Sequence, residues 1–530
     1  MIEIYIVMKK FIVKNKFLLL TLALLSISSC SEEFLDRPPE DSYNADAFYN
    51  TPEQVAAATN ALYTRPWFDY VSNVSWCIGE LASGNGRTWD PRNQDFDNFA
   101  VTGNHNTLGQ AWTSLYAVIA QSNAVINLVP ISAGPEVSES AIKNAVGEAR
   151  AMRALAYFHL VRIFGPVPII EDNVEIVGEA SIPANLVDDI YRFIKEDLQY
   201  AVDNITNTKA TAPGRISSNG AKAMLAKVHL TRREYSDAYQ LSSQVIASSE
   251  FKLLGGTGSD GTSGSYYDLF LTENDNNNES IIALQWTGSG EYAEGNAVQS
   301  LYALSGITGF SDGWSAIGPS IDLQEEYEDQ DLDERYYATI MEPESFYPDL
   351  NGGYTAPAQA NCNAQGTRVA IKKYVVGNPA NIGGGAQQSY PNNTYILRYS
   401  DLLLVNAESI IMGGGGSMSE AEESINKVRN RAGLGSISNP TFDDVFHERK
   451  IEFAFEMEHW FDVIRMDTVD ALEYLSTRER GSWDISTDPP TFNSKLVTVT
   501  EDKLLFPYPT NETLNNPALE GDPVPYDFDN

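Results

Sequence analysis

The chain has 530 residues, of which 43% are apolar and 11% aromatic, and it carries 36 basic against 72 acidic side chains. This length and apolar content can bury a large core, which argues against a disordered chain despite the net charge of −36. The excess negative charge repels phosphate backbones and anionic lipid headgroups, so it argues against a nucleic-acid-binding or basic membrane-surface protein. Three cysteines are too few for a disulfide scaffold, although Cys77 and Cys362 could bond if the fold brings them together.

The first 29 residues have the pattern of a secretory signal. Four lysines between positions 9 and 16 precede a short apolar run, Phe17 to Leu25, and small residues lead to Cys30. The run is about half the roughly 20 residues that a membrane span needs, and no later apolar run approaches that length. The position of Cys30 resembles the lipobox of bacterial lipoproteins, in which the cysteine is acylated and the signal is cut just before it. We therefore expect residues 1–29 to be removed and Cys30 to carry a lipid anchor.

Helical patterning dominates the chain from residue 51 to about residue 250, after a proline-containing tether at 30–50. Two stretches, 221–246 and 400–434, share one layout, in which an alanine-containing helix is followed by a turn and a second helix. This layout is typical of tetratricopeptide-like hairpins, and two unrelated helical hairpins are the alternative. The region between them, 251–394, is rich in Gly, Ser, Asn and Pro, with only short strand-like runs. Long loops on a helical scaffold are usually functional, so the ligand is expected there and in the loops of 64–107.

Patterns that would indicate catalysis or a cofactor are weak. The glycine motif at Gly256–Gly261 is not followed by a helix that could hold a pyrophosphate, and no GxSxG sequence occurs. The five histidines include no HxxxH pair, so neither a metal nor a cofactor is expected. Asp275–Glu279 offers oxygen ligands without the spacing of an EF-hand, which favours a solvated turn over a calcium site. With so many acids in the chain, a pair of carboxylates for glycoside hydrolysis has no weight as evidence.

Aromatic side chains in the predicted loops are the more informative feature. The apolar face of a sugar ring stacks on an indole, while nearby Asn, Asp and Arg side chains bind the hydroxyl groups. Two loop sequences, GNGRTWDPRN (84–93) and GFSDGWSAIG (309–318), supply this mixture. A packing role remains the alternative for each tryptophan taken alone. The candidate ligand-binding residues are Trp67, Asn85, Arg87, Trp89, Asp90, Tyr292 and Trp314.

Several sequence blocks occur in an order that resembles the SusD/RagB family of Bacteroidetes outer-membrane lipoproteins. Phe34-Leu35-Asp36 follows Cys30, and the chain closes with a Pro-Tyr-Pro motif at 507–509. The longest blocks between them are EARAMRALAYFHLVRIFGPVPII (148–170), LRYSDLLLVNAE (397–408), INKVRNRAGL (425–434) and ERKIEFAFEMEHWFDVIR (448–465). The resemblance covers nearly the whole mature chain. It departs at Met457, where a glycine is common, and in the loops.

The resemblance implies a mainly α fold with four tetratricopeptide-like hairpins packed against a loop-rich remainder. It divides the chain into a signal (1–29), a lipidated tether (30–50) and one domain (51–530), with its scaffold mainly at 51–250 and 395–435, loops at 251–394 and a C-terminal part at 436–530. Within that part, the spacing of Glu448, Glu452 and Glu456 suggests one helix with internal ion pairing.

The resemblance also implies a function without catalysis. Members of the family capture oligosaccharide, or sometimes peptide, and pass it to a TonB-dependent, SusC-like channel of the outer membrane. The acidic Ser31-Glu32-Glu33 after the anchor resembles the signal that places such lipoproteins on the outer face of that membrane. Glycan binding is therefore the main expectation. Peptide capture and a surface glycoside hydrolase are the alternatives.

Overall fold

The structure is a computed structural model that describes residues 49–179, 181–256, 261–362 and 365–529. The signal segment, the lipidation site Cys30 and almost all of the tether lie outside the described residues. So do residues 257–260 of the glycine motif.

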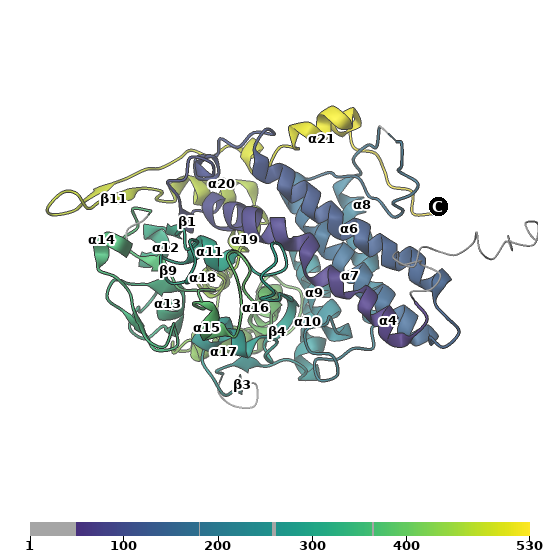
Figure 1. Ribbon diagram of the computed structural model, residues 1–530, viewed down its shortest axis with the longest axis horizontal. Helices are drawn as coiled ribbons and strands as arrows, with labels where there is room; N and C mark the ends of the chain where they lie inside the picture. The colour runs from purple at the N-terminus through teal and green to yellow at the C-terminus, as the bar shows by residue number, and fades with distance from the viewer. Residues whose placement is uncertain (1–48, 180, 257–260, 363–364, 530) are drawn as a thin grey trace, which may run out of the picture.

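Seven helices pack against one another in chain order. Figure 1 shows the first five on one side of the molecule and the last two nearer its middle. Several begin at serine N-caps, such as Ser138 and Ser217, whose side chains accept a hydrogen bond from the first turn. The segment 249–398 separates α10 (Tyr235–Ser248) from α16 (Tyr399–Ile411) in the sequence, yet the two helices are in direct contact. The seven are α6 (Asn106–Ser132), α7 (Glu139–Phe164), α8 (Val187–Asn204), α9 (Ser218–Thr231), α10 (Tyr235–Ser248), α16 (Tyr399–Ile411) and α17 (Met418–Arg431).

The predicted hairpins at 221–246 and 400–434 are α9 with α10 and α16 with α17, so the mainly α architecture is confirmed. The prediction that no later apolar run approaches the length of a membrane span was wrong. By length and composition, helix α6 could cross a membrane. It packs along α7, however, with Leu115 and Ile119 buried, which makes it a core helix of the stack.

The loop-rich side contains many short elements and small two-stranded sheets (Figure 1). The sheets pair β1 (Gly86–Arg87) with β5 (Gly318–Pro319), β4 (Ser280–Leu284) with β10 (Thr394–Arg398), β2 (Leu253–Leu254) with β3 (Gly261–Thr262), β6 (Ile340–Met341) with β9 (Ala370–Ile371), β7 (Phe346–Tyr347) with β8 (Tyr354–Thr355), and β11 (Ser482–Asp484) with β12 (Thr491–Asn493).

The other α-helices of the described residues are α4 (Pro52–Ala58), α5 (Gln94–Asp97), α11 (Val298–Tyr302), α12 (Ile321–Glu325), α13 (Glu334–Thr339), α14 (Gln359–Cys362), α15 (Pro379–Ile382), α18 (Phe442–Glu452), α19 (His459–Ile464), α20 (Thr468–Thr477) and α21 (Thr510–Asn515). The described residues also form two π-helical segments, η3 (Tyr70–Val74) and η4 (Cys77–Ala82), and the 3₁₀ turns η1 (Asn60–Tyr63), η2 (Arg65–Trp67), η6 (Tyr267–Phe270), η7 (Thr272–Asn274), η8 (Glu501–Lys503) and η9 (Pro517–Glu520).

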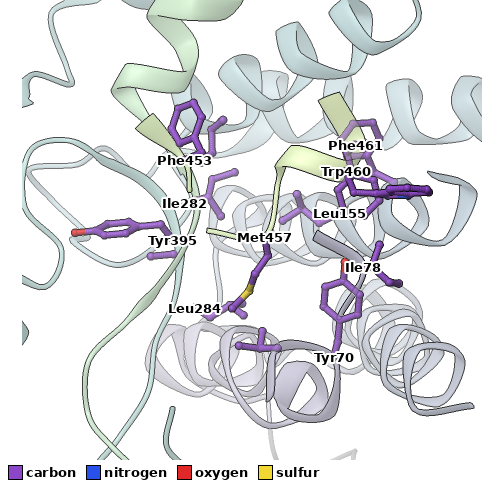
Figure 2. Packing of buried hydrophobic residues seen from close by; sticks show 14 of the residues in the cluster. Tyr70, Ile78, Leu155, Ile282, Leu284, Tyr395, Phe453, Met457, Trp460 and Phe461 are labelled. Atoms are coloured by element: carbon purple, nitrogen blue, oxygen red, sulfur yellow. The ribbon is translucent and has the colours of Figure 1, made fainter. Parts of the chain in front are cut away.

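One hydrophobic core joins the two sides. Figure 2 shows Leu284 of strand β4 near Met457, with Tyr70 of η3 and Ile78 of η4 in the same cluster. Leu155 of α7 and Trp460 of α19 extend the cluster toward the helical stack. Because one cluster holds residues from both sides, the helical stack and the loops are parts of a single packed body.

The helix expected across Glu448, Glu452 and Glu456 is shorter than the spacing suggested. Helix α18 ends at Glu452, and Phe455 and Met457 have positive φ angles of 60° and 70°. The chain therefore turns before Glu456, and the prediction of one helix with internal ion pairs was wrong. The glutamates instead bind arginines from other elements.

A buried ion network fills the space behind that turn. The Glu452 Oε1 atom lies 2.9 Å from Arg398 Nη1 and also contacts Arg431, while Arg335 approaches its second oxygen at 3.4 Å. All four side chains are almost fully buried. Removing one partner from such a network leaves uncompensated charge in the interior.

The positive φ of Met457 explains why a glycine suits this position, since a residue without Cβ enters the left-handed region freely. The same turn lies against Gly79 of η4. A Cβ atom built on Gly79 would stand 2.5 Å from both the Cα and the carbonyl oxygen of Met457. The two backbones can approach this closely only because residue 79 has no side chain.

We expect Gly79→Ala to destabilise the protein by about 3 kcal/mol, because backbone atoms on both sides must move. Thermal unfolding of the purified variant measures this. Gly109→Ala is the matched control, since a Cβ at Gly109 of α6 meets nothing within 4 Å and helix propensity favours alanine there. Equal melting temperatures for both variants would contradict the close approach.

Candidate functional site

Strand pairing brings the two predicted tryptophan loops together. In the antiparallel pair of β1 and β5, Arg87 lies opposite Gly318. Trp89 follows β1 and Trp314 precedes β5, so both tryptophans leave the same end of the small sheet. Next to them, Thr88 Oγ1 donates a hydrogen bond to the Ala316 carbonyl at 2.7 Å. The two loops, more than 200 residues apart in sequence, thus form one surface.

Gln365, which was not among the predicted site residues, connects these loops. Its Oε1 accepts a hydrogen bond from the Trp89 backbone N–H at 2.6 Å, and its Nε2 donates to the Ser315 carbonyl at 2.6 Å. The Arg87 guanidinium donates to the Gln365 carbonyl and lies 5.0 Å from the centre of the Trp89 ring. Arg87 is buried, so its role in the structure is to hold the Trp89 loop rather than to reach solvent.

Three of the predicted aromatic residues are exposed. The exposed fractions are 44% for Trp89, 45% for Trp314 and 62% for Tyr292. Tyr292 lies edge-on to Phe68, with ring centroids 4.9 Å apart, beside η3. Their exposure leaves these rings free to stack on a ligand, so they remain candidates for ligand contact.

The Trp314 loop is held in place by a buried carboxylate. Asp312 accepts hydrogen bonds from Ser300 Oγ and Thr308 Oγ1 at 2.6 Å each and from the Tyr390 hydroxyl at 2.7 Å. Burial disfavours the charged form of Asp312, but these hydrogen bonds outweigh it and lower its pKa. The backbone N–H of Trp314 donates to the Ser300 carbonyl at 2.8 Å. These hydrogen bonds fix the backbone that carries the exposed Trp314 ring.

A cavity of about 920 Å³ opens beside Trp314. Its wall runs from Trp314 and Gln365 past Asp90 to the first turn of α6, where Asn106 and Gln110 line it. Asp90 pairs with Arg92 at 2.6 Å. The hydrogen bond from Arg92 is the main cause that lowers the pKa of Asp90. The candidate site is thus an aromatic surface next to a polar cavity.

Two predicted site residues lie in the core instead. Trp67 is fully buried at the end of η2, and its Nε1 donates to the Leu62 carbonyl at 2.8 Å. Asn85 is fully buried too, and its Nδ2 donates to Glu80 Oε2 at 3.2 Å. Neither side chain reaches the surface, so we withdraw both from the candidate ligand contacts. Arg87 is buried as well and holds the Trp89 loop, so we withdraw it too. The remaining candidates, Trp89, Asp90, Tyr292 and Trp314, stay predictions.

Glu80, which accepts the hydrogen bond from Asn85, should make the stability of the fold depend on pH. Burial raises the pKa of Glu80 to about 7, and the hydrogen bonds from the Met457 N–H and Asn85 only partly oppose this. A carboxyl group whose folded pKa is raised stabilises the fold fully below its unfolded pKa, near 4.5, and loses that contribution as pH rises through about 7. The Glu80 contribution therefore falls by up to about 3 kcal/mol between pH 4.5 and 8.

Glu80→Gln should remove this dependence, because the amide stays neutral and can still accept from the Met457 N–H. We expect the melting temperature of the variant, relative to the unsubstituted protein, to be higher at pH 8 than at pH 5. Thermal unfolding at the two pH values measures it. Parallel changes in both proteins would show that Glu80 is charged throughout.

Other chemistry in the described residues is limited. His229, Glu234 and Asp237 hold ligand atoms within 4.8 Å of one another, but Lys195 Nζ already binds both Glu234 oxygens, at 2.8 and 3.1 Å. Cys77 and Cys362 are both buried free thiols, so they do not bond to each other. Burial raises the pKa of Cys362 to about 11, which makes it unreactive.

Comparison with known proteins identifies the family. The family model described as "SusD family" matches residues 238–524, and a second, "Starch-binding associating with outer membrane", matches 33–230. A "SusD-like protein" from Bacteroides ovatus is 35% identical over 97% of this chain and 99% of its own length. The chain belongs to the SusD family.

Solved structures of SusD-like proteins confirm the fold. One, determined with a xylogluco-oligosaccharide, is 33% identical to this chain, with a TM-score of 0.79 over 90% of this chain and all of that one. Surface glycan-binding protein A from Bacteroides uniformis has a TM-score of 0.67 at 23% identity over 88% of this chain, which supports the fold alone. The site residues that were not predicted from the sequence, above all Gln365, lie in loops whose composition resembles that of many other loops. Composition therefore could not single them out.

Proposed function

We propose that this SusD-family protein binds a glycan at the cell surface without cleaving it. The observation that carries the proposal is the joint exposure of Trp89 and Trp314, two indole rings whose loops are held together by Gln365. Such rings suit the apolar faces of sugars in a neighbouring pair of binding positions. The relative solved with a xylogluco-oligosaccharide, at 33% identity, supports a glycan as the ligand.

The chemistry of Asp90 argues against a role for this residue as the acid of a glycosidase. A glycosidase needs one carboxylic acid that stays protonated near neutral pH to donate to the leaving group. Asp90 lines the cavity, but its bond to Arg92 lowers its pKa and keeps it ionised. We therefore assign Asp90 a role in positioning Arg92 or in accepting hydrogen bonds from sugar hydroxyls.

Affinity electrophoresis against a panel of plant, host and microbial polysaccharides tests the proposal. We expect slower migration in at least one gel and no release of shorter sugars from the same polysaccharide. Sugar release would favour the surface glycoside hydrolase. Peptides that bind where no polysaccharide does would favour peptide capture by the same scaffold.

The proposed cellular role follows from the family and from the sequence of the first 33 residues. We propose that a lipid on Cys30 holds the protein on the outer face of the outer membrane, where it delivers glycan to a TonB-dependent, SusC-like channel. Purification from native membranes should yield the two proteins together. Recovery of this protein without a large outer-membrane barrel would contradict delivery to a channel.

Cys30→Ser should release the protein from membranes, because the thiol that takes the acyl chains is gone. Fractionation of cells that express the variant measures this, with labelling by a fatty-acid analogue as a second readout. Cys77→Ser is the matched control, since Cys77 is a buried thiol of the folded body. Continued membrane association of the Cys30 variant would count against the lipid anchor.

A further inference from the structure

The cavity beside Trp314 is larger and more polar than two stacking rings require. Its volume of about 920 Å³ is near the upper end of the range for ligand pockets. A linear glycan lying across Trp89 and Trp314 would leave most of this space to water. The cavity therefore has room for a part of the ligand that branches from the main chain of the glycan.

The cavity wall is rich in amide side chains that the protein itself does not use. Asn93, Asn104, Asn106, Gln110 and Gln388 all line it. Within the described residues, none of their side chains makes a hydrogen bond, whereas the buried Asn123 and Asn296 each make several. A primary amide offers both donors and acceptors, as a sugar hydroxyl does. These five groups are thus available to a ligand with many hydroxyls.

The charges at the cavity are largely neutralised. Arg92 is paired with Asp90 at 2.6 Å, and His105 Nε2 lies 2.7 Å from the Arg92 carbonyl. Asp95 is the other acidic residue of the lining, and it forms no ion pair within the described part of the chain. The remaining charge is therefore negative, which disfavours a uronic acid or a sulfated sugar and favours a neutral one.

The cavity is continuous with the aromatic surface. Trp314 is itself part of the lining, and Gln365 forms the wall on the side of Trp89. A substituent on a sugar stacked at Trp314 would point into the cavity without a change in the main chain. Asp312 fixes the Trp314 loop, so this geometry is already present without ligand.

We infer that the cavity is a second binding position, which takes a neutral sugar branch of the glycan whose main chain lies on Trp89 and Trp314. The inference rests on the proposed glycan-binding function and adds to it a ligand class, namely branched neutral polysaccharides. Recognition of the branch comes from the unused amides, and recognition of the main chain comes from the tryptophans.

Calorimetric titration with matched oligosaccharide pairs tests the inference. One pair is a linear β-glucan oligosaccharide and a xyloglucan oligosaccharide with the same main chain, and the other is a linear mannan and a galactomannan oligosaccharide. In at least one pair, we expect the branched member to bind at least 10-fold more tightly than the linear one. Equal affinities in every pair that binds, or no binding by either pair when another polysaccharide of the panel binds, would overturn the inference but leave the proposed function intact. Failure of both pairs and of every polysaccharide in the panel would overturn both.

A variant separates the two binding positions. Gln110→Leu keeps the size of a side chain that has no hydrogen-bond partner in the described structure, so the fold should persist. We expect it to weaken binding of the branched sugar about 10-fold and to leave the linear sugar unchanged. The control is Gln240→Leu on the exposed surface of α10, where the amide makes only a long hydrogen bond of 3.4 Å to Ser236 Oγ, and it should affect the binding of neither sugar. Equal losses for both sugars with Gln110→Leu, or no loss at all, would contradict a branch position in the cavity.

Discussion

Replacement of both Trp89 and Trp314 by alanine should lower the affinity for the bound glycan at least 100-fold, with little change in melting temperature. Truncating a buried aromatic contact at a binding surface costs about 2 kcal/mol or more per ring, and 100-fold corresponds to about 2.7 kcal/mol. Both rings are almost half exposed, so the folded core does not depend on them. Calorimetry and thermal unfolding on the same samples measure the two effects.

The control for this experiment is Phe346→Ala. Phe346 is an exposed aromatic residue on β7, away from the cavity lining, so its loss should leave glycan affinity unchanged. Unchanged affinity in the double tryptophan variant would place the ligand elsewhere. A large fall in its melting temperature would mean that the two rings serve the core.

Glu452→Ala should destabilise the protein by about 3–5 kcal/mol, the second large effect that we expect. The substitution leaves Arg398, Arg431 and Arg335 buried around a missing carboxylate. Burial alone would raise the pKa of Glu452, but Arg431, Arg398 and Arg335 outweigh it and lower it well below its usual value. The stabilisation is thus present above the unfolded pKa and is lost only as pH falls through the lowered folded pKa.

Denaturant unfolding at pH 5 and pH 8 measures this effect, and the loss should be similar at the two pH values. Glu196→Ala is the matched control, because Glu196 pairs with Arg192 on the exposed face of α8. An exposed pair of this kind contributes well under 1 kcal/mol. If both variants unfold at the same denaturant concentration, the buried network does not hold this part of the fold together.

The helical stack could be predicted because its signal is local. Apolar residues recur with the helical period, and serine caps or glycine turns mark the ends, so α9 with α10 and α16 with α17 followed from the sequence alone. The error at α18 has a local cause as well. Glutamates at every fourth position fit a helix, and nothing in this side-chain pattern reveals the positive φ angles of Phe455 and Met457, which a helix cannot contain.

The site was predicted only in part, because the sequence shows which residues suit a ligand but not which ones the fold exposes. Trp67 and Trp89 have similar loop surroundings, yet η2 places the first inside the core and β1 leads the second to the surface. Gln365 acquires its position from residues far away in the chain. No pattern in its own neighbourhood could have identified it.

The contact between α10 and α16 has a consequence for how the protein folds. The chain must complete segment 249–398 before α16 can cover α10, so the side of α10 that α16 contacts, at Ser242, stays open until then. Long-range contacts of this kind form slowly, since the entropy of closing the intervening loop comes before the gain from the contact. A nascent chain therefore has an interval in which α6 to α10 are assembled and one apolar side is exposed, and protection by a chaperone would matter most during that interval.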